Sequence, residues 1–516
     1  MDLERRHHYD YVLVGSGPGA SAWLHHTLTN SPTPPKILML ERGPFSKIDV
    51  LTESNPFKVL SASKKIVANY NHGVMQGKTL GGGTAVNNYA WVTPSYRDLK
   101  HALNITRNPF ILNVVKSYED LVEQLLGNRQ TPHPLHQFLT SSRPVECKLV
   151  TSARIIVEAT NRQKVFLGCP TLNSNGERRS GFTGVVEPLW REHFDHLHIK
   201  TDVEVKKVLF EDWKKGEQPR VRGVETFDGT VFTAGAVVLS CGCLETPAVL
   251  MRSGIGPATH LRERDVDVIV DNPHVGQHLK DKMLLDDMII TDNDASGFDK
   301  SLLLVNRVFR DGVSVQLHRY DKWTVGNSYL AMSRLLRGAW QDILPSKGMS
   351  MVHAFRNAAT YLSPAGYNAF CFQTYVKMES EASIRLSNDG MLRAELNADN
   401  FFNEVNNREV ELKKRVENIY RDVHAMRDHT LIDYHTTVPA ILRGPLGPHW
   451  RLVWHFAGTC RVGDVLHPEN FGVKGVRGLH VSDMSACRVT SDGGTMGMAY
   501  LTGTVAAAQM LKARTR

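Results

Sequence analysis

The sequence predicts an α/β protein, α+β overall, that contains more than one domain. Three observations support this fold class. Residues 9–41 read as a strand, a glycine turn, a helix and a second strand; strand-like segments follow one another between 197 and 240; and further strand-like segments precede a charged helix at about 404–426. A chain of 516 residues is long enough for two or three domain-sized cores. Because no repeat, low-complexity tract or linker separates the segments, we expect interleaved domains.

The first unit begins with a short β-rich run, YDYVLV, at residues 9–14. The turn Gly15-Ser16-Gly17-Pro18-Gly19-Ala20 follows and leads into a helix through Trp23 and Leu24. The SPTPP segment ends that pattern, and the apolar KILMLERG segment forms a second strand that ends at Glu41. This alternation predicts a Rossmann-like βαβ unit.

The glycine turn matches the pattern G-x-G-x-x-[G/A]. The first glycine, Gly15, allows the tight turn, the second, Gly17, lets the backbone approach a pyrophosphate, and Ala20 allows close packing of helix on strand. Amides at the helix N-terminus can donate to phosphate oxygens, and Glu41 stands where a carboxylate can accept both ribose hydroxyls. The pattern predicts binding of an adenine dinucleotide, with a tight turn that binds nothing as the alternative. It does not choose between FAD and NAD.

A second glycine-rich stretch, GKTLGGGTAVNNYAW, covers residues 77–91. Three consecutive glycines leave a run of backbone amides that can surround an anionic or carbonyl-rich ligand. The alternative is a flexible loop, which would not need Thr84, Asn87 and Asn88 so close together.

A third stretch, LVWHFAGTCRVG at residues 452–463, places one titratable ring in an apolar run. Leu452, Val453, Trp454, Phe456 and Ala457 read as a buried strand, and His455 stands among them. On these residues alone, a histidine packed in the core is the more frequent explanation, and a catalytic histidine is the alternative.

The composition, with 42% hydrophobic and 22% charged residues, is that of an ordinary soluble globular protein. The net charge is +8, but lysines and arginines are scattered, so we expect no nucleic-acid partner. Seven cysteines, an odd and low number, argue against a disulfide framework. The first residues, MDLERRHHYD, lack the apolar core of a signal peptide, and no stretch reaches the roughly 18 apolar residues of a membrane span. We therefore expect a cytoplasmic protein with no membrane span.

Four blocks together resemble the glucose–methanol–choline (GMC) family of FAD-dependent oxidoreductases. The first is the N-terminal unit up to Glu41, and the second, GKTLGGGTAVNN at 77–88, is similar to the family's loop around the flavin. The third, SCGCLETPAVLMRSGIG at 240–256, is similar to the second family signature, and DNPHVGQHLKDK follows where the family has V-G-x-x-L-x-D. The fourth, WHFAGTCRVG and then GVRGLHVSDMSA, resembles the active-site strand and the segment that returns to the FAD domain.

The resemblance implies a GMC oxidoreductase fold with a discontinuous, Rossmann-like FAD-binding domain at 1–100, 196–286 and 446–516. Residues 101–195 and 287–445 would form a substrate-binding domain of β-sheet and helices. Val205 stands where the family holds the adenine by a strand backbone, and Asp483 would face the ribityl–phosphate region. The residues implied to contact FAD are Gly15, Ser16, Gly17, Pro18, Gly19, Ala20, Glu41, Arg42, Gly82, Gly83, Thr84, Asn87, Asn88, Ala90, Val205, Gly242, Asp483, Thr495 and Met496.

The resemblance also implies that His455 is the general base that removes the hydroxyl proton while hydride leaves for the flavin N5. The family usually places a second His or Asn near it, but the corresponding position here is Gly494. Thr495 or Asp492 could replace that partner, or His455 could act alone or with a residue of the substrate domain. The alternatives are other chemistry on the same fold, as a lyase or decarboxylase, or an FAD-binding protein of low catalytic activity.

Where covalently flavinylated members of the family carry a histidine, this chain has Val86, so non-covalent FAD is expected. The expected reaction partners are a small alcohol-type substrate and an electron acceptor, oxygen or another molecule. No metal is expected.

Overall fold

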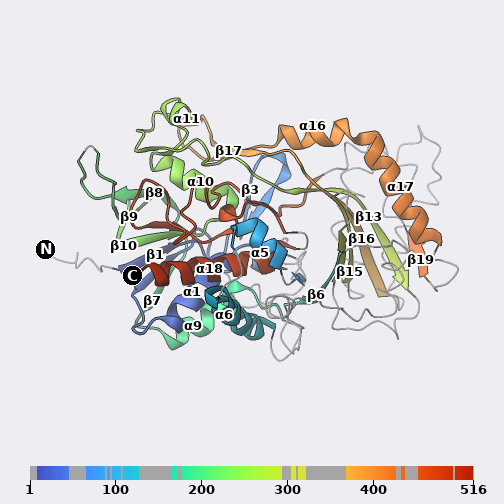
Figure 1. Ribbon diagram of the computed structural model, residues 1–516, viewed down its shortest axis with the longest axis horizontal. Coiled ribbons are helices and arrows are strands. Elements are labelled where there is room, and N and C mark those ends of the chain that lie inside the picture. Colours follow the sequence, from blue (N-terminus) through green and yellow to red (C-terminus); the bar gives the residue numbers. More distant parts are fainter. Residues whose placement is uncertain are drawn as a thin grey trace.

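The structure is a computed structural model. It describes residues 9–45, 66–87, 90–92, 94, 96–105, 109–126, 164–171, 177–214, 216–292, 304–308, 312–320, 368–425, 432–435, 451–491 and 494–514. Two large sheets organise these residues, and Figure 1 shows them at opposite ends of the long axis.

The first sheet has seven strands in the order β7-β2-β1-β10-β9-β8, with β21 paired to β10. The pairs among β7, β2, β1, β10 and β21 are parallel, and β9 and β8 continue the sheet in antiparallel fashion. The strands are β1 (Tyr9–Val14), β2 (Ile37–Leu40), β7 (Leu197–Lys200), β8 (Val205–Phe210), β9 (Val221–Thr226), β10 (Val231–Leu239) and β21 (Leu479–Val481). The apolar β1, β2 and the end of β10 are buried, as expected for central parallel strands covered on both faces.

Helices from distant parts of the chain cover this sheet. The helix α1 (Pro18–Asn30) packs along α18 (Thr495–Arg514), and α6 (Pro109–Leu126) packs against both. Figure 1 shows these three together on one side of the sheet and α10 (Gly242–Arg252) on the other. The helices α1 and α18 approach each other closely, because a Cβ on Gly503 would lie 2.1 Å from the carbonyl oxygen of Gly19.

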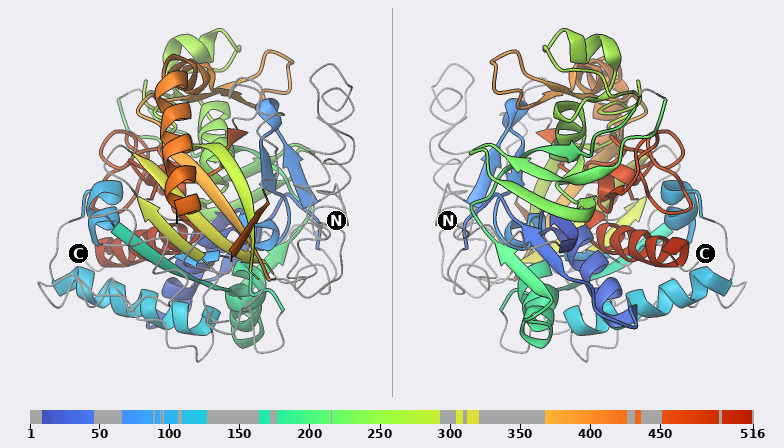
Figure 2. Two further views of the ribbon diagram at one scale, coloured as in Figure 1. Left: turned by 90° about the vertical axis from the view of Figure 1, so that its right-hand side faces the viewer. Right: turned by 90° about the vertical axis from the view of Figure 1, so that its left-hand side faces the viewer.

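The second sheet has eight strands in the order β19-β13-β16-β15-β14-β6-β5, with β20 paired to β13. All its pairs are antiparallel. Its strands are β5 (Ala90–Val92), β6 (Lys164–Pro170), β13 (Lys282–Asp292), β14 (Leu304–Val308), β15 (Val313–Tyr320), β16 (Asn368–Lys377), β19 (Ile432–His435) and β20 (Arg451–Leu452). The helices α16 (Asp399–Asn407) and α17 (Glu409–Ala425) run beside it, and α17 contacts β13 (Figure 2).

Shorter elements connect these layers. They are β3 (Val67–Asn69), η2 (Asn71–Gly73), β4 (Met75–Gly77), α4 (Gly83–Val86), α5 (Tyr96–Leu103), η3 (Phe182–Val186), α9 (Glu187–Glu192), β11 (Ile255–Gly256), α11 (Ala258–Arg262), β12 (Val270–Asp271), β17 (Ser383–Leu386), β18 (Ala394–Asn397) and η8 (Met484–Ala486). No helix among the described residues is both long enough and apolar enough to cross a bilayer.

The predicted fold class is confirmed: the protein is α/β, with a helix-covered, mostly parallel sheet and a separate antiparallel sheet. The division of the chain into two interleaved domains stays a prediction. The charged helix expected at 404–426 is two helices, α16 and α17. The buried strand expected at 452–457 is wrong, because β20 ends at Leu452 and the Trp454 side chain is 39% exposed.

Candidate cofactor and active site

The turn between β1 and α1 contains three glycines in different surroundings. Gly15 has a φ of +94°, and a Cβ there would lie 2.4 Å from the carbonyl oxygen of Ser240. A Cβ on Gly19 would lie 2.2 Å from the carbonyl oxygen of Ser482. A Cβ on Gly17 would meet no heavy atom within 4 Å. Gly15 and Gly19 therefore allow close packing within the protein, whereas Gly17 faces open space.

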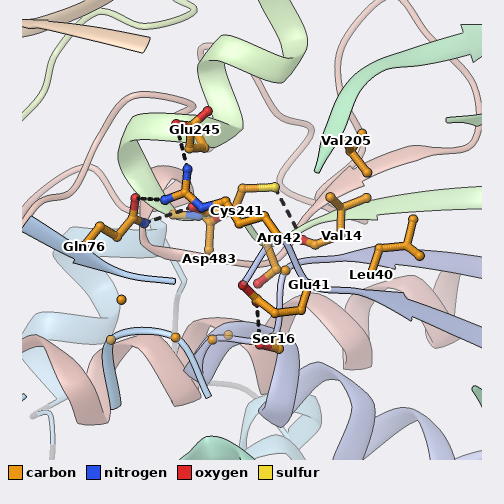
Figure 3. Close-up of a pocket in the computed structure, with 18 of the residues that line it drawn as sticks. Val14, Ser16, Leu40, Glu41, Arg42, Gln76, Val205, Cys241, Glu245 and Asp483 are labelled. Atoms are coloured by element: carbon orange, nitrogen blue, oxygen red, sulfur yellow. Dashed lines mark hydrogen bonds and ion pairs between the residues drawn. The ribbon is translucent and has the colours of Figure 1, made fainter. Parts of the chain in front are cut away.

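That space is a cleft, which we call the cofactor cleft, between β1, β2, β8, the N-terminus of α10 and η8 (Figure 3). Twelve residues predicted to contact the cofactor line it: Gly15, Ser16, Gly17, Pro18, Gly19, Glu41, Arg42, Gly82, Gly83, Val205, Gly242 and Asp483. The sequence did not indicate the other lining residues, which include Gln76, Cys241 and Glu245.

The first turn of α1 is suited to an anion. Gly17 is its N-cap and has no side chain to accept from the helix amides; Pro18 follows, and the turn contains no acidic residue. The free amides and the positive end of the helix dipole are therefore available to a phosphate.

Glu41 immediately follows β2 and lines the cleft beside the glycine turn. Its carboxylate accepts hydrogen bonds from the Ser16 hydroxyl at 2.6 Å and from the Gly43 amide at 2.8 Å. Burial raises the pKa of Glu41 and outweighs the lowering by these hydrogen bonds. The two hydrogen bonds fix the carboxylate beside the glycine turn, where it can accept from hydroxyl groups of a ligand.

The triple-glycine loop packs against the first turn and also lines the cleft. A Cβ on Gly82 would lie 2.9 Å from the Cα of Gly17, so glycine at 82 allows this close approach. Thr84 is used inside the protein: its hydroxyl donates to the Gly81 carbonyl at 2.6 Å and accepts from the Gly181 amide at 2.8 Å. Thr84 thus shapes the loop, and it is not among the residues that line the cleft.

A fully buried arginine, Arg178, supports the same loop. Its guanidinium donates to the Thr84 carbonyl at 3.0 Å and to Asn87 Oδ1 at 2.9 Å. The Asn87 amide group in turn lies 3.4 Å from the Met496 sulfur. Asn87 and Met496, both predicted cofactor contacts, are therefore joined, but neither lines the cleft.

Charged side chains lie beside the cleft on the α10 side. The Arg42 guanidinium donates to Glu245 Oε1 at 3.0 Å and to Gln76 Oε1 at 3.2 Å (Figure 3). It also donates to the Tyr70 hydroxyl at 2.9 Å. Burial raises the pKa of Glu245, but Arg42 and Arg252 outweigh it, so that the pKa lies below its usual value. Glu245 is therefore a buried carboxylate held ionised by two cations.

Asp483 joins the C-terminal part of the chain to the cleft. Its carboxylate accepts from the Thr246 hydroxyl at 2.6 Å, the Gly242 amide at 2.9 Å and the Ser485 amide at 2.8 Å. Burial raises the pKa of Asp483 despite these bonds. Through them the aspartate fixes the N-terminus of α10 against η8.

The segment that carries His455 is bonded to α10, at one wall of the cleft. The Cys243 thiol donates to the Phe456 carbonyl at 3.1 Å, and the Thr459 hydroxyl donates to the Cys243 carbonyl at 2.8 Å. The segment that carries His455 is thus bonded to the first turn of α10, whose Gly242 lines the cleft. His455 is half-buried and does not itself line the cleft.

The position of the expected second polar side chain is Gly494, whose carbonyl accepts from the Ser491 hydroxyl at 3.1 Å. Thr495 follows as the first residue of α18 and is half-buried. Asn88 and Asp492 lie outside the described residues, and Ala90 is placed only as the first residue of β5.

Comparisons with known proteins agree with this arrangement. The chain is 27% identical over 307 residues to oxygen-dependent choline dehydrogenase from Sinorhizobium fredii, covering 53% of each protein. It is 26% identical over 332 residues to ecdysone oxidase from Bombyx mori, covering 56% of this chain and 47% of that one. The chain spans about half the length of the curated relatives it matches.

Solved structures share the fold over nearly the whole chain. Pyridoxine 4-oxidase from Mesorbium loti matches with a TM-score of 0.66 and 17% identity, covering 98% of this chain and 99% of that one. A variant of formate oxidase from Aspergillus oryzae matches with a TM-score of 0.64 and 19% identity, covering 98% and 99%. A model of the family described as GMC oxidoreductase matches residues 9–284, more than half of the chain. The chain therefore belongs to the GMC oxidoreductase family.

Proposed function

We propose that the protein binds FAD in the cofactor cleft and oxidises an alcohol group of a small molecule, with His455 as general base. The observation that carries the proposal is the combination of the open Gly17 turn with a histidine segment bonded to the wall of the same cleft. The matched relatives are named as oxidases and dehydrogenases of alcohols such as choline, which supports this class of reaction.

The described residues fit FAD. The uncapped amides of α1 would hold the pyrophosphate, Glu41 the adenine ribose, and the backbone at Val205 the adenine. Val86 offers no nucleophilic atom for a covalent bond, so the flavin should be released by acid precipitation.

When bound, FAD supplies the oxidising power by accepting hydride. The protein has to take the hydroxyl proton, and the imidazole of His455 would accept it. Thr495 is the candidate for a second polar contact to the substrate oxygen, since Gly494 has no side chain. The electron acceptor is then oxygen or another small molecule.

The test is anaerobic bleaching of the flavin absorbance by a panel of small alcohols, repeated in air to identify the acceptor. His455→Ala should reduce the bleaching rate by about 100-fold or more. His467→Ala, at an exposed histidine of the same region, should bleach like the wild type. Full bleaching by His455→Ala would show that His455 is not the base.

The glycine at 494 favours one second candidate, a GMC-fold flavoprotein with lyase or decarboxylase chemistry or with little activity. That candidate predicts bound FAD whose absorbance no alcohol changes.

A further inference from the structure

One buried carboxylate next to the His455 segment has no part in the function proposed so far. Asp281 immediately precedes β13 and is fully buried. It accepts a hydrogen bond from the Trp454 amide at Oδ2, 3.1 Å away, and from the His455 amide at Oδ1, 2.8 Å away. It therefore bonds directly to the backbone of the residue proposed as the base.

The pairing of the strands around Asp281 explains why its side chain bonds to this backbone. The Lys280 and Ala457 backbones exchange both hydrogen bonds, at 2.8 and 3.0 Å, and Met283 pairs with Leu452. Between these two pairs, one strand has two residues (281 and 282) and the other has four (453–456). Two additional residues must therefore bulge out of the ladder.

The bulge interrupts the regular ladder of backbone hydrogen bonds. Val453 still donates to the Lys282 carbonyl at 3.1 Å, whereas the amides of Trp454 and His455 donate to the Asp281 carboxylate. The carboxylate thus supplies an acceptor to each amide where the ladder is interrupted. The far end of the bulge is held by the Cys243 thiol, which donates to the Phe456 carbonyl.

The bulge also contains an unfavourable backbone conformation. Trp454 has a φ of +66°, in the left-handed region that a bulky side chain rarely adopts. Such a conformation persists only where the surroundings fix it. The amides of Trp454 and His455, which flank the Trp454 Cα, both donate to one buried carboxylate, and these two hydrogen bonds fix this conformation.

We propose that Asp281 is a positioning residue for His455: its carboxylate holds the bulge in the shape that presents the imidazole to the substrate. This inference rests on the proposed function. Asp281 acts through the backbone and has no contact with substrate. An apolar residue at 281 would remove the carboxylate that both amides donate to, and the peptide would be expected to turn away from the left-handed conformation.

Asp281→Asn is the main test. Asparagine has the same size, but only one of its two terminal atoms can accept, so one amide loses its partner. The matched control is Glu404→Gln: the Glu404 carboxylate also accepts from two consecutive amides, Glu379 at 3.2 Å and Ser380 at 2.8 Å, away from the cleft. Asp281→Ser, which is smaller and reaches neither amide, serves if the asparagine variant is not recovered folded.

Two measurements separate positioning from a purely structural effect. The first is the limiting rate of anaerobic flavin reduction, which should fall by about 100-fold in Asp281→Asn and stay within about two-fold of wild type in Glu404→Gln. The second is the same substitution in a His455→Ala background, where it should change the residual rate by less than about two-fold, because the group it positions is gone.

Amide hydrogen exchange of a peptide over residues 452–458 provides a readout that does not need activity. Asp281→Asn should speed exchange there, and Glu404→Gln should not. A wild-type flavin that no alcohol bleaches would overturn the proposed function. Unchanged exchange in Asp281→Asn, or an equal loss of rate with and without His455, would overturn the positioning role itself.

Discussion

Substitution of Gly17 tests the cofactor cleft directly. An added methyl group there should weaken FAD binding without lowering the stability of the fold. Its φ of −69° and ψ of −176° are allowed for alanine, and the new Cβ would meet no heavy atom within 4 Å. Gly17→Ala should therefore leave the stability of the flavin-free protein unchanged or raise it by about 0.4–1 kcal/mol.

The same methyl group would project into open space at Gly17, which lines the cleft. A phosphate that accepts an amide hydrogen bond lies about 2.9 Å from the nitrogen, whereas a methyl carbon requires roughly 3.5 Å or more. Loss of one charge-assisted hydrogen bond costs about 1.5–3 kcal/mol, which corresponds to about a 10- to 100-fold weaker Kd for FAD.

The assay is titration of flavin-free protein with FAD, followed by flavin fluorescence, together with thermal unfolding. Gly19→Ala gives the contrast: its Cβ would lie 2.2 Å from the Ser482 carbonyl oxygen, so the fold itself should lose about 1–3 kcal/mol or more. Gly17→Ala protein that binds FAD as tightly as wild type would refute the assignment of the turn.

Three further results are expected. Glu41→Gln should weaken FAD binding by about 10-fold, since it replaces one acceptor oxygen by an amide group; titration with FAD measures it. Arg42→Met should lower the free energy of unfolding by about 3–5 kcal/mol in urea, because it removes a cation from the buried Glu245, and Glu245→Gln in the same protein should restore part of the loss. Burial raises the pKa of Asp281 from 3.8 to about 7, so the folded protein binds a proton that the unfolded chain releases between these values. The Asp281 contribution should therefore lower the stability by an amount on the order of 4 kcal/mol as the pH rises from about 4 to about 7 and then level off. Asp281→Asn should remove this contribution from the pH dependence measured by urea unfolding.

The sequence was most informative where local conformation dictates residue type. A strand that turns into a helix over a phosphate-sized space requires glycine at fixed positions, and Gly15 and Gly17 could be assigned separate tasks before the structure was known. The structure places both at the turn and Glu41 beside it.

Contacts between residues that are far apart in the chain could not be found this way. Arg178 is bonded to Asn87 across 91 positions, Asp281 to His455 across 174, and Arg42 to Glu245 across 203. No local pattern marks these pairs, because they meet only when the sheets assemble.

The strand predicted at 452–457 failed for a related reason. Its apolar residues suit a strand, but the opposite segment is two residues too short, and the Asp281 carboxylate stabilises a bulge in place of a ladder. The hydrophobic pattern of a segment indicates that it is buried, but it does not indicate how long the partner strand is.

The first sheet is complete only after β21 has paired with β10, so the cofactor cleft can form only late in translation. During synthesis the glycine turn emerges first, and Asp483, which fixes the N-terminus of α10 and lines the same cleft, emerges from the ribosome more than 450 residues later. At a synthesis rate of about 5–20 residues per second, the first half of the sheet waits on the order of half a minute or longer for its last strand. FAD is therefore expected to bind only after the sheet has assembled. Until then the apolar strands β1 and β2 lack their final partners, and we expect chaperones to bind them.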